Sequence, residues 1–194
     1  MAAAVTYPFV SQALPANRIA RLATQAALVI GGAMLLTLSA KTKVVLGPVD
    51  MSLQTLAVML IAATFGMRLG IATLLLYMAE GLYGLPVFQG TPERGLGLAY
   101  MMGTTGGYLA GFVAVAAIVG WAADRGIDRT FFRFLGVLLV AEVVMLAMGY
   151  AWLAGIVGAE AAWTAGVVPF IVPDLVKIGL AAAIMPAAWA LRRG

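Results

Sequence analysis

Several residue types that carry enzyme chemistry are missing from this chain of 194 residues. It contains no cysteine, which excludes disulfide bonds and thiol chemistry, and no histidine, the commonest metal ligand and general base. Its three serines, Ser11, Ser39 and Ser52, do not lie in a Gly-x-Ser-x-Gly setting. We therefore predict that the chain is not an enzyme, and we expect neither a metal ion nor a cofactor.

Charged residues are also scarce, at 10% of the chain, whereas 63% of its residues are hydrophobic. A water-soluble domain of this size needs a larger charged shell. A lipid bilayer removes that requirement, and each helix that spans it needs about 20 apolar residues, so this length allows about six helices. We expect an all-α integral membrane protein, a single domain over residues 1–194 built as a bundle of six transmembrane helices.

The apolar runs predict helices over residues 21–39, 52–65, 69–83, 103–123, 134–157 and 167–191. Residues 52–83 form one run that only Arg68 interrupts. A single helix of that length would be about 48 Å long, which exceeds the roughly 30 Å hydrocarbon core. Because an arginine at the membrane centre is costly, we expect two short helices with a turn at residues 66–68. The remaining segments, residues 41–51, 84–100, 124–133 and 158–166, are expected to be loops.

Basic residues are distributed unequally over the two predicted sides of the membrane. The N-terminal stretch, residues 1–15, lacks the features of a secretory signal. With the N-terminus inside, Lys41, Lys43 and Arg94 lie outside, and eight arginines lie inside: Arg18, Arg21, Arg68, Arg125, Arg129, Arg133, Arg192 and Arg193. This bias predicts that both termini are cytoplasmic. We expect a multi-pass protein of a bacterial cytoplasmic (inner) membrane, in contact with lipid and not with nucleic acid.

Lys177 lies within the last predicted helix, where it shares one helix face with Asp174 at a spacing of three residues. Charged groups at membrane depth normally face an internal cavity and have partners there. The pair could hold this helix to its neighbours, or it could bind a polar, anionic ligand that enters from outside. Pro169 and Pro173 suit the start of such a helix.

Three loop motifs are further candidates. In the first, Ser52 could cap the second helix and Gln54 could point inward from its first turn, as a polar contact or as a ligand contact. In the second, residues 85–88 form an apolar patch that could line the mouth of the bundle or anchor at the membrane surface. In the third, the glycines of residues 103–112 could let helices pack closely or expose N–H groups to a ligand.

Small residues also recur on the first helix, where Ala23, Ala27 and Gly31 are spaced by four residues. This ladder could pack against another helix of the chain or against a partner protein. Two carboxylates, Glu80 and Glu142, lie within predicted helices. For both we favour a structural role over a functional one.

Four motifs together resemble the BioY family, the biotin-specific substrate-binding components of energy-coupling-factor vitamin transporters. In family order they are Gly47-Pro48-Val49 through Gln54-Thr55-Leu56-Ala57-Val58, Tyr83-Gly84-Leu85-Pro86-Val87-Phe88, Gly106-Gly107-Tyr108-Leu109-Ala110-Gly111-Phe112, and Asp174-Leu175-Val176-Lys177. The chain departs from the family pattern at Asp50 and Thr104, where proline is common, and at Ser52, where threonine is usual. Asp50 adds a charge to the loop between the first two helices.

The resemblance implies six helices with a biotin pocket near the extracellular face and the loop between the first two helices as a lid. It assigns substrate binding to Asp174 and Lys177. We expect the remaining contacts from the motif loops, with ring contacts from two of them: Gln54, Ser52, Phe88, Gln89, Thr105 and Tyr108. Partners would be an energising transmembrane (T) subunit, docked on Ala23 and Ala27 with Gly31 on the same face, and two ABC-type ATPase subunits.

Two other functions stay open at this point. The chain could take up another vitamin such as thiamin, although a cationic ligand has no need of Lys177. It could also be a membrane assembly subunit without a ligand, in which case Asp174 and Lys177 would form a closed pair with no cavity beside them.

Overall fold

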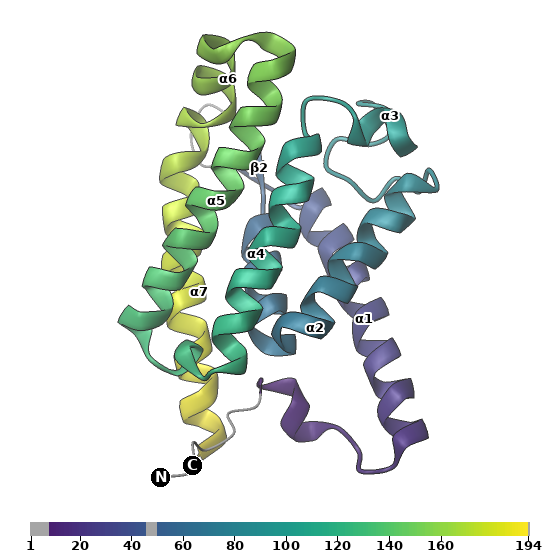
Figure 1. Ribbon diagram of the computed structural model, residues 1–194, viewed down its shortest axis with the longest axis vertical. Helices are drawn as coiled ribbons and strands as arrows, with labels where there is room; N and C mark the ends of the chain where they lie inside the picture. The colour runs from purple at the N-terminus through teal and green to yellow at the C-terminus, as the bar shows by residue number, and fades with distance from the viewer. Residues whose placement is uncertain (1–7, 46–49, 194) are drawn as a thin grey trace.

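A computed structural model describes residues 8–45 and 50–193 of the chain. The helices and strands, in chain order, are η1 (Val10–Ala13), α1 (Arg18–Lys41), β1 (Lys43–Val45), β2 (Asp50–Ser52), α2 (Gln54–Leu82), α3 (Gly97–Met101), α4 (Gly106–Asp124), η2 (Ile127–Arg129), α5 (Phe131–Val157), α6 (Ala159–Gly166) and α7 (Val168–Arg193). The long helices lie along the longest axis of the molecule, with α7 on one side and α1 on the other (Figure 1). Five helical segments of the described chain are long and apolar enough to span a membrane.

The α2 segment consists of two helices, because Gly66 has a non-helical backbone with φ 77° and ψ 178°. A residue with a Cβ is strained at such a positive φ, and here the Cβ would also collide with Asp124 and Pro8. The two halves pack closely, since a Cβ on Gly70 would lie 3.3 Å from the Cα of Ala62. With α2 counted as two, the bundle has six long helices, which confirms the predicted turn and the predicted helix number.

Glycines bring α4 and α5 into close contact at the centre of the bundle. A Cβ added to Gly111 would lie 3.1 Å from the Cα of Met145, and one added to Gly107 would lie 2.6 Å from the carbonyl oxygen of Met148. The glycine-rich motif therefore serves helix packing, as expected for membrane helices. We predicted that this helix begins at Gly103. Instead, residues 103–105 form a turn and α4 begins at Gly106.

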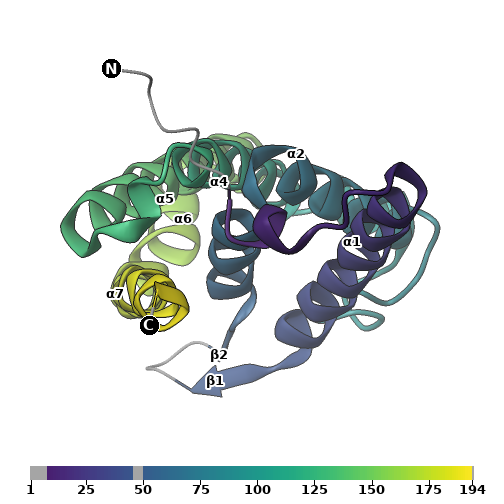
Figure 2. The ribbon, with the colours of Figure 1, turned by 90° about the horizontal axis from the view of Figure 1, so that it is seen from below.

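The two described ends of the chain meet at the same end of the bundle. The guanidinium of Arg192 donates a 2.6 Å hydrogen bond to the carbonyl oxygen of Phe9. Beside them, Trp189 packs edge-on against Phe9 with ring centroids 5.1 Å apart, and it donates a 2.5 Å hydrogen bond to Asp128. The guanidinium of Arg129 lies over the ring of Trp189. We call these five residues, Phe9, Asp128, Arg129, Trp189 and Arg192, the terminal cluster. Figure 2 views this end of the molecule, where the N-terminal segment crosses in front of α2.

All four predicted loops contain regular structure, since residues 124–133 include η2 and the start of α5. Residues 41–51 include strand β1, which pairs antiparallel with β2 so that Lys43 lies opposite Ser52. Residues 84–100 include the start of α3, and residues 158–166 contain α6. Ser52 therefore belongs to a strand and is not the N-cap that we predicted; Leu53 holds that position, and the Ser52 hydroxyl accepts a 3.4 Å hydrogen bond from the N–H of Gln54.

Candidate functional site

A cavity of about 490 Å³ lies at the end of the bundle opposite the terminal cluster. Its walls come from the start of α2, the loop after α2, the start of α4, the end of α5, α6 and α7. The lining residues are Ser52, Gln54, Thr55, Gln89, Arg94, Tyr100, Thr104, Thr105, Tyr108, Leu109, Phe112, Met145, Leu153, Val157, Ala161, Ala165, Phe170, Asp174 and Lys177. The cavity is mostly apolar with a few charged and polar groups, which is typical of sites for small organic ligands.

Asp174 and Lys177 are the buried charges of this cavity. Their side chains are joined by a 2.8 Å ion pair between Nζ of Lys177 and Oδ1 of Asp174. Asp174 is 1% exposed and Lys177 is 3% exposed. The other oxygen of Asp174, Oδ2, has no hydrogen-bond partner within residues 8–45 and 50–193. The pair is therefore neutral overall: the ammonium of Lys177 keeps N–H groups for a ligand, and the buried oxygen Oδ2 of Asp174 still needs a donor.

Gln54 reaches the cavity from the first turn of α2, as predicted. Its amide donates a 2.9 Å hydrogen bond to the hydroxyl of Tyr77, and that hydroxyl donates in turn to the carbonyl oxygen of Val87 at 3.1 Å. Ser52 and Thr55 line the same wall. This chain of hydrogen bonds ties α2 to the loop that follows it, so Gln54 is held in one orientation.

The loop after α2 contributes Gln89, which we predicted, and Arg94, which we did not. The hydroxyl of Tyr100 holds the loop by a 2.8 Å hydrogen bond to the carbonyl oxygen of Gln89. The ammonium of Lys41, at the end of α1, donates to the carbonyl oxygen of Thr91 at 2.6 Å and to its hydroxyl at 2.8 Å. The loop lies on the opposite side of the molecule from α7 (Figure 1), and Arg94 of the loop and Lys177 of α7 both line the cavity.

Thr105 and Tyr108 line the cavity from the start of α4, as predicted. The Tyr108 hydroxyl donates a 2.6 Å hydrogen bond to the carbonyl oxygen of Gly166, which fixes the ring between α4 and α6. Its ring stacks on Phe170 of α7, with centroids 6.1 Å apart. Phe170 was missed by the sequence analysis, although its position one turn before Asp174 on the same helix was a usable signal.

Phe88, which we predicted as a ring contact, is not among the residues that line the cavity. It is 1% exposed, and its ring stacks on Tyr100 at 4.9 Å and lies edge-on to Tyr77 at 5.3 Å. A Cβ on Gly81 would collide with it. Phe88 therefore supports Tyr100, which lines the cavity in its place.

The ladder on α1 lies on an exposed face. Ala23, Ala27 and Gly31 are exposed, and a Cβ added to Gly31 would meet nothing within 4 Å in the described part of the chain. Large apolar side chains on the same helix are exposed as well, including Met34 at 63% and Leu38 at 66%. The ladder does not pack against residues 8–45 or 50–193, so among these residues nothing covers the face that could contact lipid or another protein.

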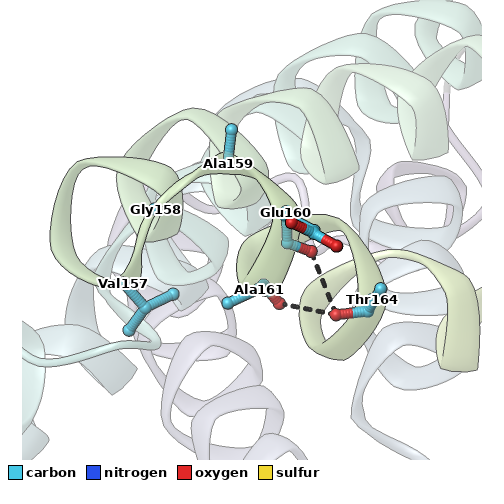
Figure 3. Close-up of a pocket in the computed structure, with 6 residues that line it drawn as sticks. All are labelled: Val157, Gly158, Ala159, Glu160, Ala161 and Thr164. Atoms are coloured by element: carbon cyan, nitrogen blue, oxygen red, sulfur yellow. Dashed lines mark hydrogen bonds between the residues drawn. The ribbon is translucent and has the colours of Figure 1, made fainter.

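A second hollow lies at the turn between α5 and α6 (Figure 3). Glu160 is the single charged residue that lines it, and the hydroxyl of Thr164 donates to backbone carbonyl oxygens of α6 itself. Its polar groups do not converge on a common point, so we do not regard it as a binding site.

The predicted lid falls partly on residues 46–49, which lie outside the described residues.

Comparison with known proteins identifies the family. The model of the BioY family matches residues 10–194. The chain belongs to the BioY family. It is similar to a probable biotin transporter BioY of Pyrococcus horikoshii, with 37% identity over 77% of this chain and 86% of the relative. The biotin transporter BioY of Thermotoga maritima is 33% identical over 77% of this chain and 86% of the relative. These relatives are transporters, in agreement with our expectation that the chain is not an enzyme.

The fold is likewise that of a solved S-component. A crystal structure described as the S-component for biotin from an ECF-type ABC transporter superposes with a TM-score of 0.73, covering 93% of this chain and 96% of the other. At 22% identity this likeness concerns the fold alone. The chain is thus a multi-pass, all-helical membrane protein with the S-component fold.

Proposed function

We propose that this chain binds biotin in the cavity at the end of the bundle and is the substrate-binding subunit of a biotin uptake system. The observation that carries the proposal is the buried Asp174–Lys177 pair, which faces a cavity of about 490 Å³ in a member of the BioY family. A pair with only a structural role has no need of a cavity beside it. The proposal covers Ser52, Gln54, Gln89, Thr105 and Tyr108 as further contacts.

The chemistry of biotin suits these walls. Its ureido group offers two N–H donors and one carbonyl acceptor, and its valerate chain ends in a carboxylate. An aspartate accepts N–H donors strongly, and an ammonium donates to a carbonyl. Asp174 and Lys177 lie too close together to hold both ends of an extended ligand, whereas Arg94 lines the cavity from a different element, the loop after α2. We assign the ureido group to Asp174 and Lys177 and the carboxylate to Arg94, with the fused rings between Tyr108 and Phe112.

Uptake also needs partners and a defined orientation. We propose that an energising transmembrane subunit docks on the exposed face of α1 at Ala23, Ala27 and Gly31, and that two ABC-type ATPase subunits supply the energy. Small residues on an exposed face allow close approach of another helix. We place the terminal cluster on the cytoplasmic side, because Arg125, Arg129 and Arg192 gather at that end. The cavity then opens outward.

Calorimetric titration of the purified protein in detergent tests the proposal. Biotin is the ligand, and thiamin and riboflavin are the controls. We expect saturable one-to-one binding of biotin and no heat from the other two vitamins. Protein that is folded by size-exclusion chromatography and still fails to bind biotin would contradict the proposal, and binding of thiamin instead would reassign the substrate.

A further inference from the structure

Glu142 is a buried carboxyl group that the proposed contacts do not use. It lies in the middle of α5 and is 5% exposed. Both of its carboxyl oxygens are covered, and neither has a hydrogen-bond partner in the described part of the chain. Such an unsatisfied buried group is rare in native proteins and calls for a physical explanation.

The surroundings of Glu142 supply one. The charged groups that act on it are Asp174 and Lys177 of the neighbouring helix α7. Lys177 is already paired with Oδ1 of Asp174, while Oδ2 of Asp174 lacks a partner just as the oxygens of Glu142 do. Three buried acceptor oxygens thus lie in one group without a donor among them. A single proton on Glu142 would provide that donor.

Charge balance leads to the same conclusion. If all three groups were ionised, two negative charges would share one positive charge in an environment that solvates charges poorly. With Glu142 neutral, the cluster of Glu142, Asp174 and Lys177 carries no net charge. Two carboxyl groups in one buried site commonly hold one proton between them for this reason.

We propose that Glu142 is a positioning residue for substrate binding: it is protonated at neutral pH and donates its O–H to Oδ2 of Asp174. This bond fixes the Asp174 carboxylate from behind, so that Lys177 keeps its remaining N–H groups for the ligand. Ionised Glu142 would repel Asp174 and compete for Lys177. The inference rests on the proposed role of Asp174 and Lys177, and it assigns a proton and a function to α5.

The other titratable groups near α5 do not replace Asp174 and Lys177 in this role. On α4 the Tyr108 hydroxyl is engaged with Gly166, and on α6 Glu160 is exposed. The rest lie toward the ends of α5 or at the terminal cluster, namely Asp124, Asp128, Arg129, Arg133 and Tyr150. The titration of the site is thus governed by the three-residue cluster.

The experiment measures the dissociation constant of biotin from about pH 6 to about pH 9 for the wild type, Glu142→Gln and Glu142→Leu. Glu160→Gln is the matched control, because it removes an exposed carboxylate from a neighbouring helix. At pH 7 we expect Glu142→Gln to bind within about threefold of the wild type, since its amide still donates to Asp174. Glu142→Leu should bind roughly tenfold or more weakly, since Asp174 loses its donor.

The pH profile separates positioning from packing. Wild-type affinity should fall with rising pH before that of Glu142→Gln does, because only the wild type has a proton to lose at this position, whereas Lys177 is common to both. Wild-type affinity in Glu142→Leu would overturn the proposal. The proposal would also be overturned if Glu142→Gln bound biotin as weakly as Glu142→Leu, which is the result expected for an ionised Glu142. Identical pH profiles of the wild type and Glu142→Gln would overturn it as well.

An Asp174→Ala variant distinguishes failure of this inference from failure of the proposed function. If Asp174→Ala binds biotin like the wild type, the site itself is wrong. If Asp174→Ala binds weakly while Glu142→Leu binds normally, the site stands and only the role of Glu142 is refuted. Thermal melting of each variant shows that it is folded before its affinity is compared.

Discussion

The helix α7 carries one buried aromatic group and one buried carboxylate at opposite ends, and the two environments differ. At the terminal end Trp189 donates to Asp128, and aromatic rings and guanidinium groups fill the surrounding space. At the other end Asp174 is as buried as Asp128, and each of the two carboxylates has one oxygen without a hydrogen-bond partner among the described residues, but Asp174 lies beside a cavity. Neither the burial of a charge nor an unused acceptor therefore marks a binding site by itself; the open space beside Asp174 does.

The largest effect on biotin affinity should follow from removing the ammonium group of Lys177, which lies beside the cavity. Lys177→Met retains most of the side-chain length but leaves Asp174 buried without its ion-pair partner. We expect biotin affinity to fall about a hundredfold, equivalent to about 3 kcal/mol, because the ligand loses a donor and the pair loses its charge balance. Calorimetry measures this, with Arg133→Met, which removes an exposed charge outside the cavity, as the control. Equal affinity in both variants would refute the assignment of the site.

A substitution in the terminal cluster should lower the stability of the protein and leave biotin binding unchanged. Trp189→Phe removes the N–H that donates to Asp128 while keeping an aromatic ring against Phe9. We expect the free energy of unfolding to fall by about 1–2 kcal/mol, seen as a lower melting temperature, with biotin affinity within about twofold of the wild type. Trp121→Phe, at a site 45% exposed, is the control and should change little. A large loss of affinity in Trp189→Phe would show that the two ends are coupled.

A smaller effect is expected for Arg94, which lines the cavity from an exposed loop. Arg94→Ala should weaken biotin binding by about fivefold, or about 1 kcal/mol, because water screens a charge at the mouth of the cavity. Biotin methyl ester, which lacks the carboxylate, should bind to the wild type and to Arg94→Ala equally. An Arg94 effect that persists with the ester would move the carboxylate to another residue.

The smallest effect concerns the pH dependence of stability at the terminal cluster. Burial raises the pKa of the Asp128 carboxyl, although the hydrogen bond from Trp189 and the charge of Arg129 act in the opposite direction. A raised pKa means that the folded state binds the proton more tightly than the unfolded state, whose carboxyl titrates near pH 4. Stability should therefore decrease as the pH rises through the interval between these two pKa values, and Asp128→Asn should lack that decrease. Melting temperatures of both proteins between about pH 4 and about pH 7 provide the measurement.

The sequence predicted the membrane spans well because span length and apolar content are properties of single segments. The turn at Gly66 followed from a run too long for one helix, and the Asp174–Lys177 pair followed from the cost of burying charge in a membrane. The family motifs led to the correct family. These features depend on the chain locally, so no knowledge of the tertiary arrangement was needed.

The missed features depend on how distant segments meet. From the sequence, Arg94 was expected only to be a charge on the outer side of the membrane. It lines the cavity because Tyr100 and Lys41 hold its loop in place by hydrogen bonds, and the sequence does not show these contacts. Phe88 packs into the space left by Gly81 and does not line the cavity, whereas Phe170, to which we assigned no role from the sequence, stacks on Tyr108 and lines it. Neither contact has a periodicity that a sequence can display.

The break at Gly66 has a consequence for the depth of the cavity. The first half of α2, residues 54–65, is twelve residues long and therefore spans about 18 Å, against a hydrocarbon core of roughly 30 Å. If Gly66 and Arg68 mark one membrane boundary and this half of α2 runs along the membrane normal, Gln54 would lie roughly 12 Å inside the other boundary. A molecule resting on Gln54 has already crossed about two fifths of the hydrophobic barrier before any partner protein acts on it.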